Sequence, residues 1–296
     1  MQHTDDALLI KRIQALTSPL TPQPTGVTPR LAPIPGIRAV LFDVYGTLVI
    51  SGSGDIGITT TATTNKPFRE AWAAAGFAPA LLPPDFDGTA ELAALIRADH
   101  ARSRARGVDN PEVDIVAIWR ALLDSLLGLR ATVSQLRRLA LEYEFRINPV
   151  WPMPGLRALI KTLHRRGLVL GVVSNAQFYT PLMLEAFLGQ GMEAVGFDPR
   201  CCAWSYRHGV AKPSTAIYVP ALAGLHDHHR IHPEQVLYIG NDLRNDIHPA
   251  GALDCNTVLY AGDRRSLRLH RDDPQMRAVA PDRVITTLCQ LTSHLA

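Results

Sequence analysis

Short apolar runs alternate with helical patterns along most of the chain. A continuous apolar run bounded by turn residues is typical of a strand that is buried in a parallel sheet. Such runs predict strands at 37–43, 168–173, 236–239, 257–260 and, briefly, 284–285. Between the strands we expect helices at 154–166, 179–189, 213–224 and 245–252, with a last helix at the C-terminus. Strands separated by helices predict an α/β fold with a parallel sheet.

The stretch between the first two strands follows a different pattern. Residues 64–146 show helical spacing and no strand signal. Four helices are expected there: one that begins near Lys66, one at 90–106, one from Asn110 as N-cap to Gly128, and one at 132–145. We therefore predict an all-α cap subdomain at 51–149, inserted into a core that consists of 37–50 and 150–296.

The first 36 residues form a third region. Residues 5–17 suit a short amphipathic helix, with Leu8, Leu9, Ile13 and Leu16 near one face. Residues 18–36 contain six prolines, which forbid a helix and predict an extended arm. Such an arm would pack on the core or on a partner chain, which permits a homodimer, and a loose leader is equally compatible.

Composition excludes several classes of protein. Apolar residues make up 47% of the chain and charged residues 19%, which indicates a globular protein. The net charge of +3 is too small to argue for nucleic-acid binding. No apolar run approaches the ~20 residues of a membrane helix, and the N-terminus does not resemble a secretory signal. Four cysteines without a zinc-like spacing are expected as reduced thiols, so we expect a cytoplasmic protein. We also expect it to act on a small molecule.

Polar side chains follow the ends of several predicted strands. They are Asp43 and Thr47, then Ser174 and Asn175, then Lys212 before an expected helix, and finally Asp242 and Asp246. Alone, each is compatible with a turn residue, a helix cap or a surface lysine. Together they are more informative, because the carboxyl ends of parallel strands meet at the edge where ligands bind. Two carboxylates placed there suit Mg²⁺, and a lysine can neutralise charge.

The sequence Asp-Val-Tyr-Gly-Thr at 43–47 resembles the first motif of the haloacid dehalogenase (HAD) superfamily. The order of nucleophile, serine, lysine and acid cluster is similar to that superfamily throughout 37–292, and so is the position of the helical insert. The resemblance implies an α/β fold with a Rossmann-like parallel-sheet core and an inserted all-α cap.

The resemblance also implies roles for single residues. Asp43 would be the nucleophile that forms a covalent aspartyl intermediate. The others would act around it: Thr47 and Ser174 on substrate oxygens, Tyr45, Gly46 and Asn175 beside the substrate, Lys212 on the charges, and Asp43, Asp242 and Asp246 at Mg²⁺. Asp242 would be the direct metal ligand with Asp43, and Asp246 would support it. The spacing of the last motif leaves open whether Asn241 takes the place of Asp242.

Tyr45 separates two activities. Phosphatases of the superfamily usually carry a second Asp at this position, which protonates the leaving oxygen. A phenol with a pKa near 10 is a poor substitute at neutral pH. Asp-x-Tyr-Gly-Thr is what 2-haloacid dehalogenases of the superfamily display, and a halide leaves without a proton. The acids Asp242 and Asp246 oppose that assignment, since the dehalogenases have a Ser/Asn-rich motif there.

Further residues are candidates for missing parts of either site. Asp55, in a Ser/Gly-rich loop, is one candidate for the missing acid, although a turn residue is the ordinary interpretation. A dehalogenase would need a cap arginine, and the candidates are Arg69, Arg97, Arg102, Arg104 and Arg120. A third and less favoured reaction would act on a phosphonate through a Schiff base at Lys66 of the cap.

Two charged segments near the C-terminus are more ambiguous. The basic stretch from Asp263 to Arg271 could contact an acidic substrate or a partner, but a solvated loop is the more common outcome. The segment 226–229, His-Asp-His-His, contains potential metal ligands. Its tight spacing favours an exposed loop instead.

These observations lead to one expectation with two alternatives. We expect a Mg²⁺-dependent phosphatase that acts on a small phosphomonoester through Asp43. The first alternative is a metal-independent 2-haloacid dehalogenase. The second is a non-catalytic binding module that uses the N-terminal arm as its contact.

Overall fold

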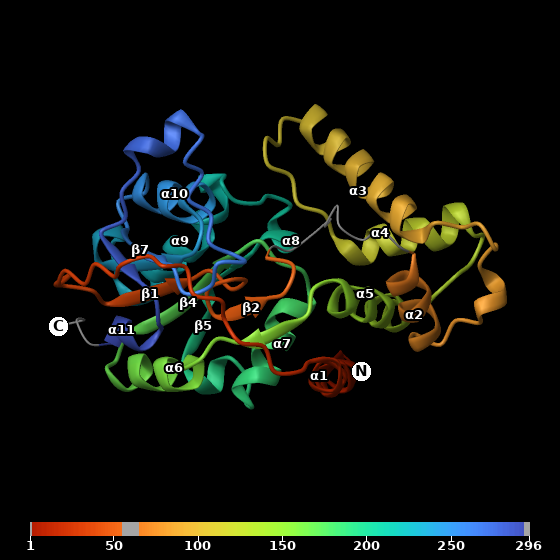
Figure 1. Cartoon of the computed structure of the whole chain (residues 1–296), viewed down its shortest axis with the longest axis horizontal. Coiled ribbons are helices and arrows are strands. Elements are labelled where there is room, and N and C mark those ends of the chain that lie inside the picture. Colours follow the sequence, from red (N-terminus) through yellow and green to blue (C-terminus); the bar gives the residue numbers. More distant parts are fainter. Residues whose placement is uncertain (1, 55–64, 293–296) are drawn as a thin grey trace.

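The computed structural model describes residues 2–54 and 65–292, and its centre is a six-stranded parallel sheet (Figure 1). The strand order is β5-β4-β1-β6-β7-β8. These strands are β1 (Ala39–Phe42), β4 (Val169–Ser174), β5 (Phe197–Trp204), β6 (Val236–Gly240), β7 (Asn256–Tyr260) and β8 (Arg283–Ile285). All five pairings are parallel, as the alternation of strands and helices predicts.

Helices cover both faces of this sheet (Figure 1). On one face lie α6 (Leu156–Arg165), α7 (Tyr179–Leu188) and α11 (Cys289–Thr292), and on the other α9 (Val219–His229) and α10 (His248–Gly251). Alternate residues of β1 serve the two faces: Val40 and Phe42 pack towards α6 and α7, whereas Ala39 and Leu41 pack towards α9. Because both faces are buried, β1 is apolar throughout, as its sequence shows.

β1 occupies the position that matters for ligand binding. It pairs with β4 on one side and with β6 on the other, so the chain order reverses around it. In open α/β sheets, ligands bind at the carboxyl ends of strands where the order reverses. The fold therefore places the ends of β1, β4 and β6 side by side.

Three strands have no counterpart in the sequence-based prediction. β5 contains Asp198 and Pro199, residue types that are depleted in strands, and lies at the edge of the sheet, where proline is tolerated. The other two, β2 (Val49–Ser51) and β3 (Val150–Pro152), are three residues long and form an antiparallel pair. They lie where the chain leaves the core for the helical insert and where it returns to the core.

The insert consists of α2 (Lys66–Ala74), α3 (Gly88–Ala105), α4 (Ile115–Ala121) and α5 (Val133–Ile147). These helices enclose an apolar cluster of their own that includes Phe68, Trp72 and Trp119. The third helix begins later than expected, because the side chain of Asp114, not Asn110, caps it by accepting from the Val116 amide; a π-helical turn then covers Leu122–Leu126. We keep 51–149 as the proposed limits of the cap.

Two expected core helices differ from their patterns in their limits and in their type of helix. The segment expected as a helix at 213–224 begins with a 3₁₀ turn at Thr215–Ile217, and α9 follows it. The segment expected at 245–252 is a π-helical turn at Leu243–Ile247 followed by the four-residue α10. Among the described helices, none is long and apolar enough to cross a bilayer.

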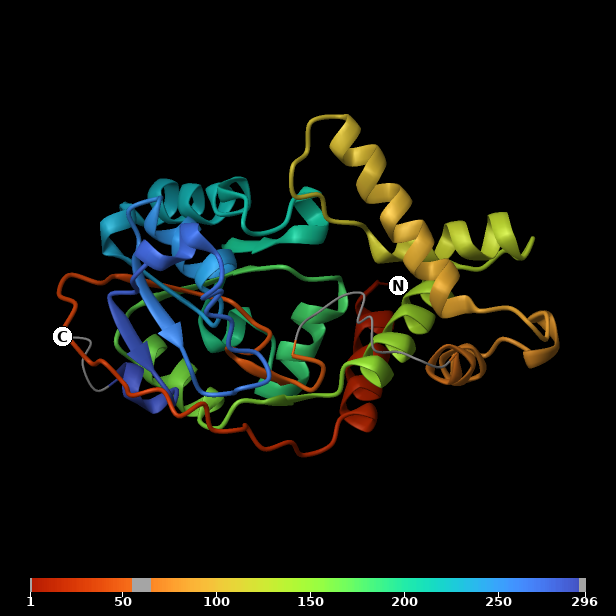
Figure 2. The same ribbon diagram turned by 45° about the horizontal axis from the view of Figure 1, so that its top comes forward.

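The N-terminal region packs on its own chain. Helix α1 (Gln2–Leu16) lies against α5 and α7 (Figure 2), and it buries Leu9 and Ile13. Leu8 does not share that face, contrary to the prediction, because it is 58% exposed. The proline-rich arm then runs along the core, where the backbones of Arg30 and Val284 exchange two hydrogen bonds.

Candidate active site

The predicted polar residues converge at the carboxyl ends of β1, β4 and β6. Asp43 directly follows β1 and is buried; Ser174 ends β4. The Ser174 hydroxyl donates to Asp43 Oδ1 at 3.0 Å, and Lys212 Nζ donates to the same oxygen at 2.6 Å. The second oxygen, Oδ2, accepts no hydrogen bond from any described residue. Asp43 is thus held through one oxygen while the other is available for chemistry.

Lys212 links two carboxylates of the site, those of Asp43 and Asp246. Its ammonium lies 2.6 Å from Asp43 Oδ1, 2.6 Å from Asp246 Oδ1 and 3.3 Å from the Tyr238 hydroxyl. Burial lowers the pKa of Lys212, but the attraction of Asp246 and Asp43 outweighs burial, so the pKa is raised and the ammonium stays charged. Asn175 positions this lysine, because its Oδ1 accepts from the Lys212 amide at 2.7 Å.

Asp246 is held by hydrogen bonds on both oxygens. Its Oδ1 accepts from Lys212, and its Oδ2 accepts from the amides of Asn241 and Asp242, each at 3.0 Å. The Tyr238 hydroxyl lies 3.0 Å from Oδ1, but its single proton also has the Val173 carbonyl as an acceptor at 2.9 Å. Asp246 thus holds Lys212 and the turn after β6, which suits the supporting role expected of it.

Asp242 has a different environment. Its Oδ1 caps the turn that follows, accepting from the amides of Arg244 and Asn245, and lies 2.8 Å from His270 Nε2. Its Oδ2 accepts only the Asn245 side-chain amide, at 2.9 Å. One oxygen of Asp242 thus keeps acceptor capacity.

The Thr47 hydroxyl, which the resemblance would place on a substrate oxygen, is engaged within the protein. The hydroxyl donates instead to Asn241 Oδ1 at 2.9 Å and is fully buried. Gly46 explains this arrangement: at φ +81° the chain turns sharply, and a Cβ there would lie 2.4 Å from the Ser266 Cβ. The turn after β1 is therefore packed tightly against Asn241 and Ser266.

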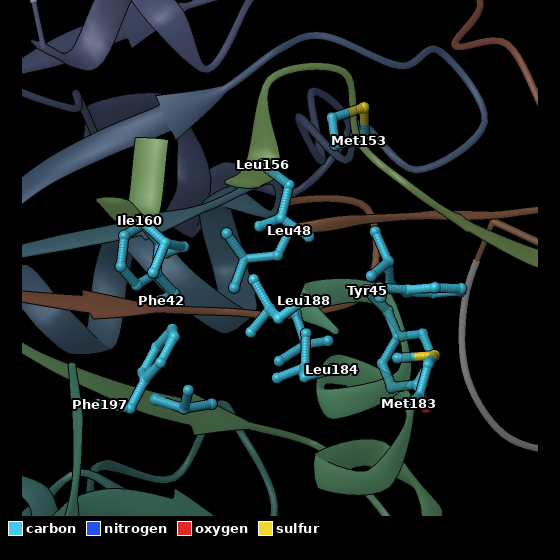
Figure 3. Close-up of a cluster of buried hydrophobic side chains, with 14 of the residues drawn as sticks. Phe42, Tyr45, Leu48, Met153, Leu156, Ile160, Met183, Leu184, Leu188 and Phe197 are labelled. Atoms are coloured by element: carbon cyan, nitrogen blue, oxygen red, sulfur yellow. The ribbon is translucent and has the colours of Figure 1, made fainter. Parts of the chain in front are cut away.

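The Tyr45 hydroxyl is buried and is not suited to proton transfer. Figure 3 shows the Tyr45 side chain among apolar core residues, next to Met183. Its hydroxyl is 3.0 Å from the Thr180 hydroxyl. Burial, reinforced by the charge of Glu144, raises its pKa far above the usual value. The phenol is therefore neither a base nor an effective acid near neutral pH.

Two adjoining cavities surround these groups. A small one of about 40 Å³ is lined by Asp43, Tyr45, Gly54, Asn175, Lys212, Asn241, Asp242, Asn245, Asp246, Ser266 and Arg268. A larger one of about 380 Å³ lies under α3, α4 and α5, and Asn175 and Asn245 line both. The arrangement suits a substrate whose reacting group enters the small cavity and whose remainder fills the large one.

Four residues that line these cavities are not among the predicted site residues. Glu144 is buried and Glu112 is half-buried in the wall of the large cavity, and desolvation raises the pKa of both, that of Glu144 to about 7. A glutamate within the apolar pattern of α5 was the available signal for Glu144. Ser266 and Arg268 line the small cavity, although their stretch was expected as a solvated loop. Arg264 in the same stretch is exposed, so that expectation holds for only part of it.

The donor set fits a magnesium ion at Asp43 and Asp242. Both carboxylates line the small cavity, and each has one oxygen with remaining acceptor capacity. Mg²⁺ prefers oxygen ligands, usually takes one or two carboxylates and keeps several waters. The neighbouring amide side chains of Asn241 and Asn245 add further oxygens. These residues would hold the ion, with Asp246 acting through Lys212.

Other sequence candidates do not reach the site. The Lys66 side chain is 79% exposed and pairs with Glu70, and it lines neither cavity. The five cap arginines, where described, also line neither cavity; Arg69, for example, donates to backbone carbonyls of its own subdomain. Asp55 lies outside the described residues.

The histidine segment belongs to the last turn of α9 rather than to a loop. His229 there contacts Asp198 at 2.7 Å and, with Cys201, forms the one group of three clustered metal-type ligands within the described ranges. Arg200 already binds both oxygens of Asp198. This group lies on β5 and α9, away from the carboxyl ends that carry Asp43, and its carboxylate is neutralised.

Comparison with known proteins identifies the family. A family model of haloacid dehalogenase-like hydrolases matches residues 37–254. No curated protein gives a significant match. The solved 2-haloacid dehalogenase of Pseudomonas syringae pv. Tomato is similar at a TM-score of 0.53 and 20% identity, over 87% of this chain and 97% of that chain.

Two further structures are similar at lower TM-scores. A HAD phosphatase from Thermococcus onnurineus aligns at 0.46 with 16% identity, over 87% of this chain and 97% of that one. A magnesium-bound putative HAD hydrolase of Bacillus subtilis aligns at 0.46 with 17% identity and the same two coverages. At these identities the structures share a fold alone. Because the family model spans well over half of the sequence, the chain belongs to the haloacid dehalogenase-like hydrolases.

Proposed function

We propose that this hydrolase is a Mg²⁺-dependent phosphatase that acts on a small phosphomonoester, with Asp43 as the nucleophile. The observation that carries the proposal is that Asp43 and Asp242 face one small cavity, each with an oxygen that retains acceptor capacity. Two carboxylates beside an anionic substrate repel it unless a cation is present. A divalent ion at these oxygens removes that repulsion.

The contacts of Asp43 support its role. Ser174 and Lys212 both hold Oδ1, which leaves Oδ2 to attack. In the first step a bond forms between Oδ2 and phosphorus, and the bond from phosphorus to the leaving oxygen breaks. In the second step water adds to phosphorus and releases phosphate and the Asp43 carboxylate. Bound magnesium supplies positive charge that stabilises the phosphoryl oxygens.

The leaving oxygen requires a proton that Tyr45 cannot supply. Glu144 is our candidate for its source, because it lines the large cavity in which the leaving group would lie. Its carboxyl has a pKa raised to about 7 by burial, so it retains a proton near neutral pH. Tyr179 donates to its Oε2 at 3.0 Å and fixes its position.

Hydrolytic dehalogenation of a 2-haloacid is the second candidate, and the environment of Tyr45 favours it. A halide leaves as an anion without a proton, so a site without an acid at position 45 is sufficient. Asp43 Oδ2 would then bond to the carbon that carries the halogen, and water would cleave the resulting ester. Lys212 would serve both reactions by holding Asp43 and Asp246.

The test compares two substrates with matched variants. We expect p-nitrophenyl phosphate to be hydrolysed with Mg²⁺ and not with EDTA, and we expect Asp242→Asn to weaken activation by Mg²⁺. Asp124→Asn, on the cap surface, should behave as wild type. Halide release from 2-chloropropionate that is indifferent to EDTA and to Asp242→Asn would instead support the dehalogenase and contradict the first proposal.

A further inference from the structure

Lys212 has no hydrogen-bonding capacity left for a substrate. An ammonium carries three protons, and the three partners of Lys212 are Asp43, Asp246 and the Tyr238 hydroxyl. Its charge is shared between two carboxylates at 2.6 Å. An anionic substrate therefore needs another cation within the small cavity.

Among the described residues that line this cavity, Lys212 and Arg268 are the two that carry a Lys or Arg side chain. Arg268 Nη1 donates to the carbonyls of Arg265 and Leu267, and its Nη2 donates to that of Gly54 at 3.2 Å. A guanidinium has five N–H donors. One proton on Nη2 and the proton on Nε have no partner among the described residues. The carbonyls thus fix the guanidinium in place while two donors remain.

Ser266 adds an unsatisfied group beside it. The residue is 1% exposed and is one of those that line the small cavity, and no described residue hydrogen-bonds to its buried hydroxyl oxygen. A buried hydroxyl without a partner is unfavourable, and a hydrogen bond to a ligand oxygen would offset that cost. Its backbone carbonyl accepts from the Asn241 side chain at 2.6 Å, so the position of Ser266 is fixed.

The segment that carries both residues is held on two sides. On the site side, the Arg268 amide donates to the Asn241 carbonyl, and its carbonyl accepts from the Leu243 amide. On the outer side, the N-terminal arm contacts the same segment: the Gln23 amide donates to Asp263, and the Gln23 carbonyl accepts from the Arg264 amide. The proline-rich arm thus braces a wall of the small cavity.

We propose that Arg268 and Ser266 form the oxyanion-binding subsite of this cavity, and that they, rather than Lys212, hold the anionic oxygens of the substrate. The two free guanidinium protons would donate to two oxygens of a phosphoryl group, and the unpartnered Ser266 hydroxyl would donate to a third. The subsite rests on the proposed function for its ligand, a phosphoryl group. Its existence can be tested without turnover.

The experiment measures binding of inorganic phosphate by isothermal titration calorimetry. Arg268→Met should raise the Kd for phosphate about tenfold or more, as expected for loss of a charge-assisted contact. Arg264→Met is the matched control, because it removes the same charge from an exposed position of the same segment, and its Kd should stay within about twofold. Ser266→Ala should raise the Kd about two- to tenfold.

Arg268→Lys is a second variant that keeps the test valid if Arg268→Met fails to fold. It keeps the charge but loses the planar fork, so we expect a Kd between those of wild type and Arg268→Met, with an unchanged circular dichroism spectrum. Equal phosphate affinity in wild type, Arg268→Met and Arg268→Lys would overturn the subsite, and so would absence of phosphate binding by the wild type. If phosphate binding depends on Arg268 but no phosphate ester is hydrolysed, the subsite stands and the phosphatase proposal falls.

Discussion

At the scale of single residues, the two carboxylates that Lys212 contacts have different hydrogen-bond environments. Asp246 accepts hydrogen bonds on both oxygens, from Lys212 and from two amides of the turn after β6. Asp43 is held through one oxygen only. A buried carboxylate with an unoccupied oxygen beside a fixed cation is poised to act as a nucleophile. The same lysine thereby supports two carboxylates with different tasks.

Glu144 gives a prediction about pH. Burial raises its pKa from about 4.5 to about 7, so the folded protein binds a proton that the unfolded chain has lost between these values. The free energy of unfolding should therefore fall as pH rises from 5 to 8, by up to about 3 kcal/mol from this group. Glu144→Gln, which cannot ionise, should lose the part of the decline that this group contributes.

Urea denaturation of both proteins at pH 5 and pH 8 measures the effect. Glu193→Gln serves as the control, since Glu193 is exposed and should leave the wild-type decline intact. An equal decline in the wild type and in Glu144→Gln would show that Glu144 is already ionised at pH 5, and its role as a proton donor would then be untenable.

At the scale of elements, α1 connects the cap to the core. It packs against both α5 of the cap and α7 of the core (Figure 2). Arg12 of α1 donates twice to the buried Glu142 of α5, and Asp5 and Asp6 pair with Arg137. The helix therefore holds the subdomain that covers the large cavity against the core that carries Asp43.

This packing predicts an asymmetry between two apolar residues of α1. Ile13 is fully buried, and Ile13→Ala should lower the free energy of unfolding by about 2–5 kcal/mol through lost burial and the resulting cavity. Leu8 is 58% exposed, and Leu8→Ala should change it by no more than about 0.5 kcal/mol. Urea unfolding followed by circular dichroism measures both, and similar losses at the two positions would contradict the described docking of α1.

Local pattern explains which elements were predictable. β1, β4, β6 and β7 are predominantly apolar because both sheet faces are buried, so their sequences reveal them. β5 is an edge strand with Pro199 and charged neighbours, and its pairing with β4 supplies what its sequence does not. Its place depends on tertiary contacts, which a short window of sequence does not contain.

At the scale of the whole molecule, the site combines segments that are distant in sequence. Asp43, Ser174 and Lys212 were predictable as neighbours, because parallel strands bring their carboxyl ends to one edge. Arg268 and Glu144 were not, because one follows β7 in an irregular segment and the other faces inward from a cap helix. Their placement depends on how the segment after β7 and the cap fold over that edge.

The measurement that tests the central claim most directly is chemical trapping of the intermediate. Wild-type protein is mixed with a ³²P-labelled aryl phosphate and Mg²⁺, quenched with acid during turnover, and digested for mass spectrometry. We predict phosphorylation of the peptide that contains Asp43, and Asp43→Asn should show no label and at least about 10³-fold lower turnover. Phosphate release by the wild type with the label on another residue, or undiminished turnover in Asp43→Asn, would contradict the assignment of Asp43 as the nucleophile.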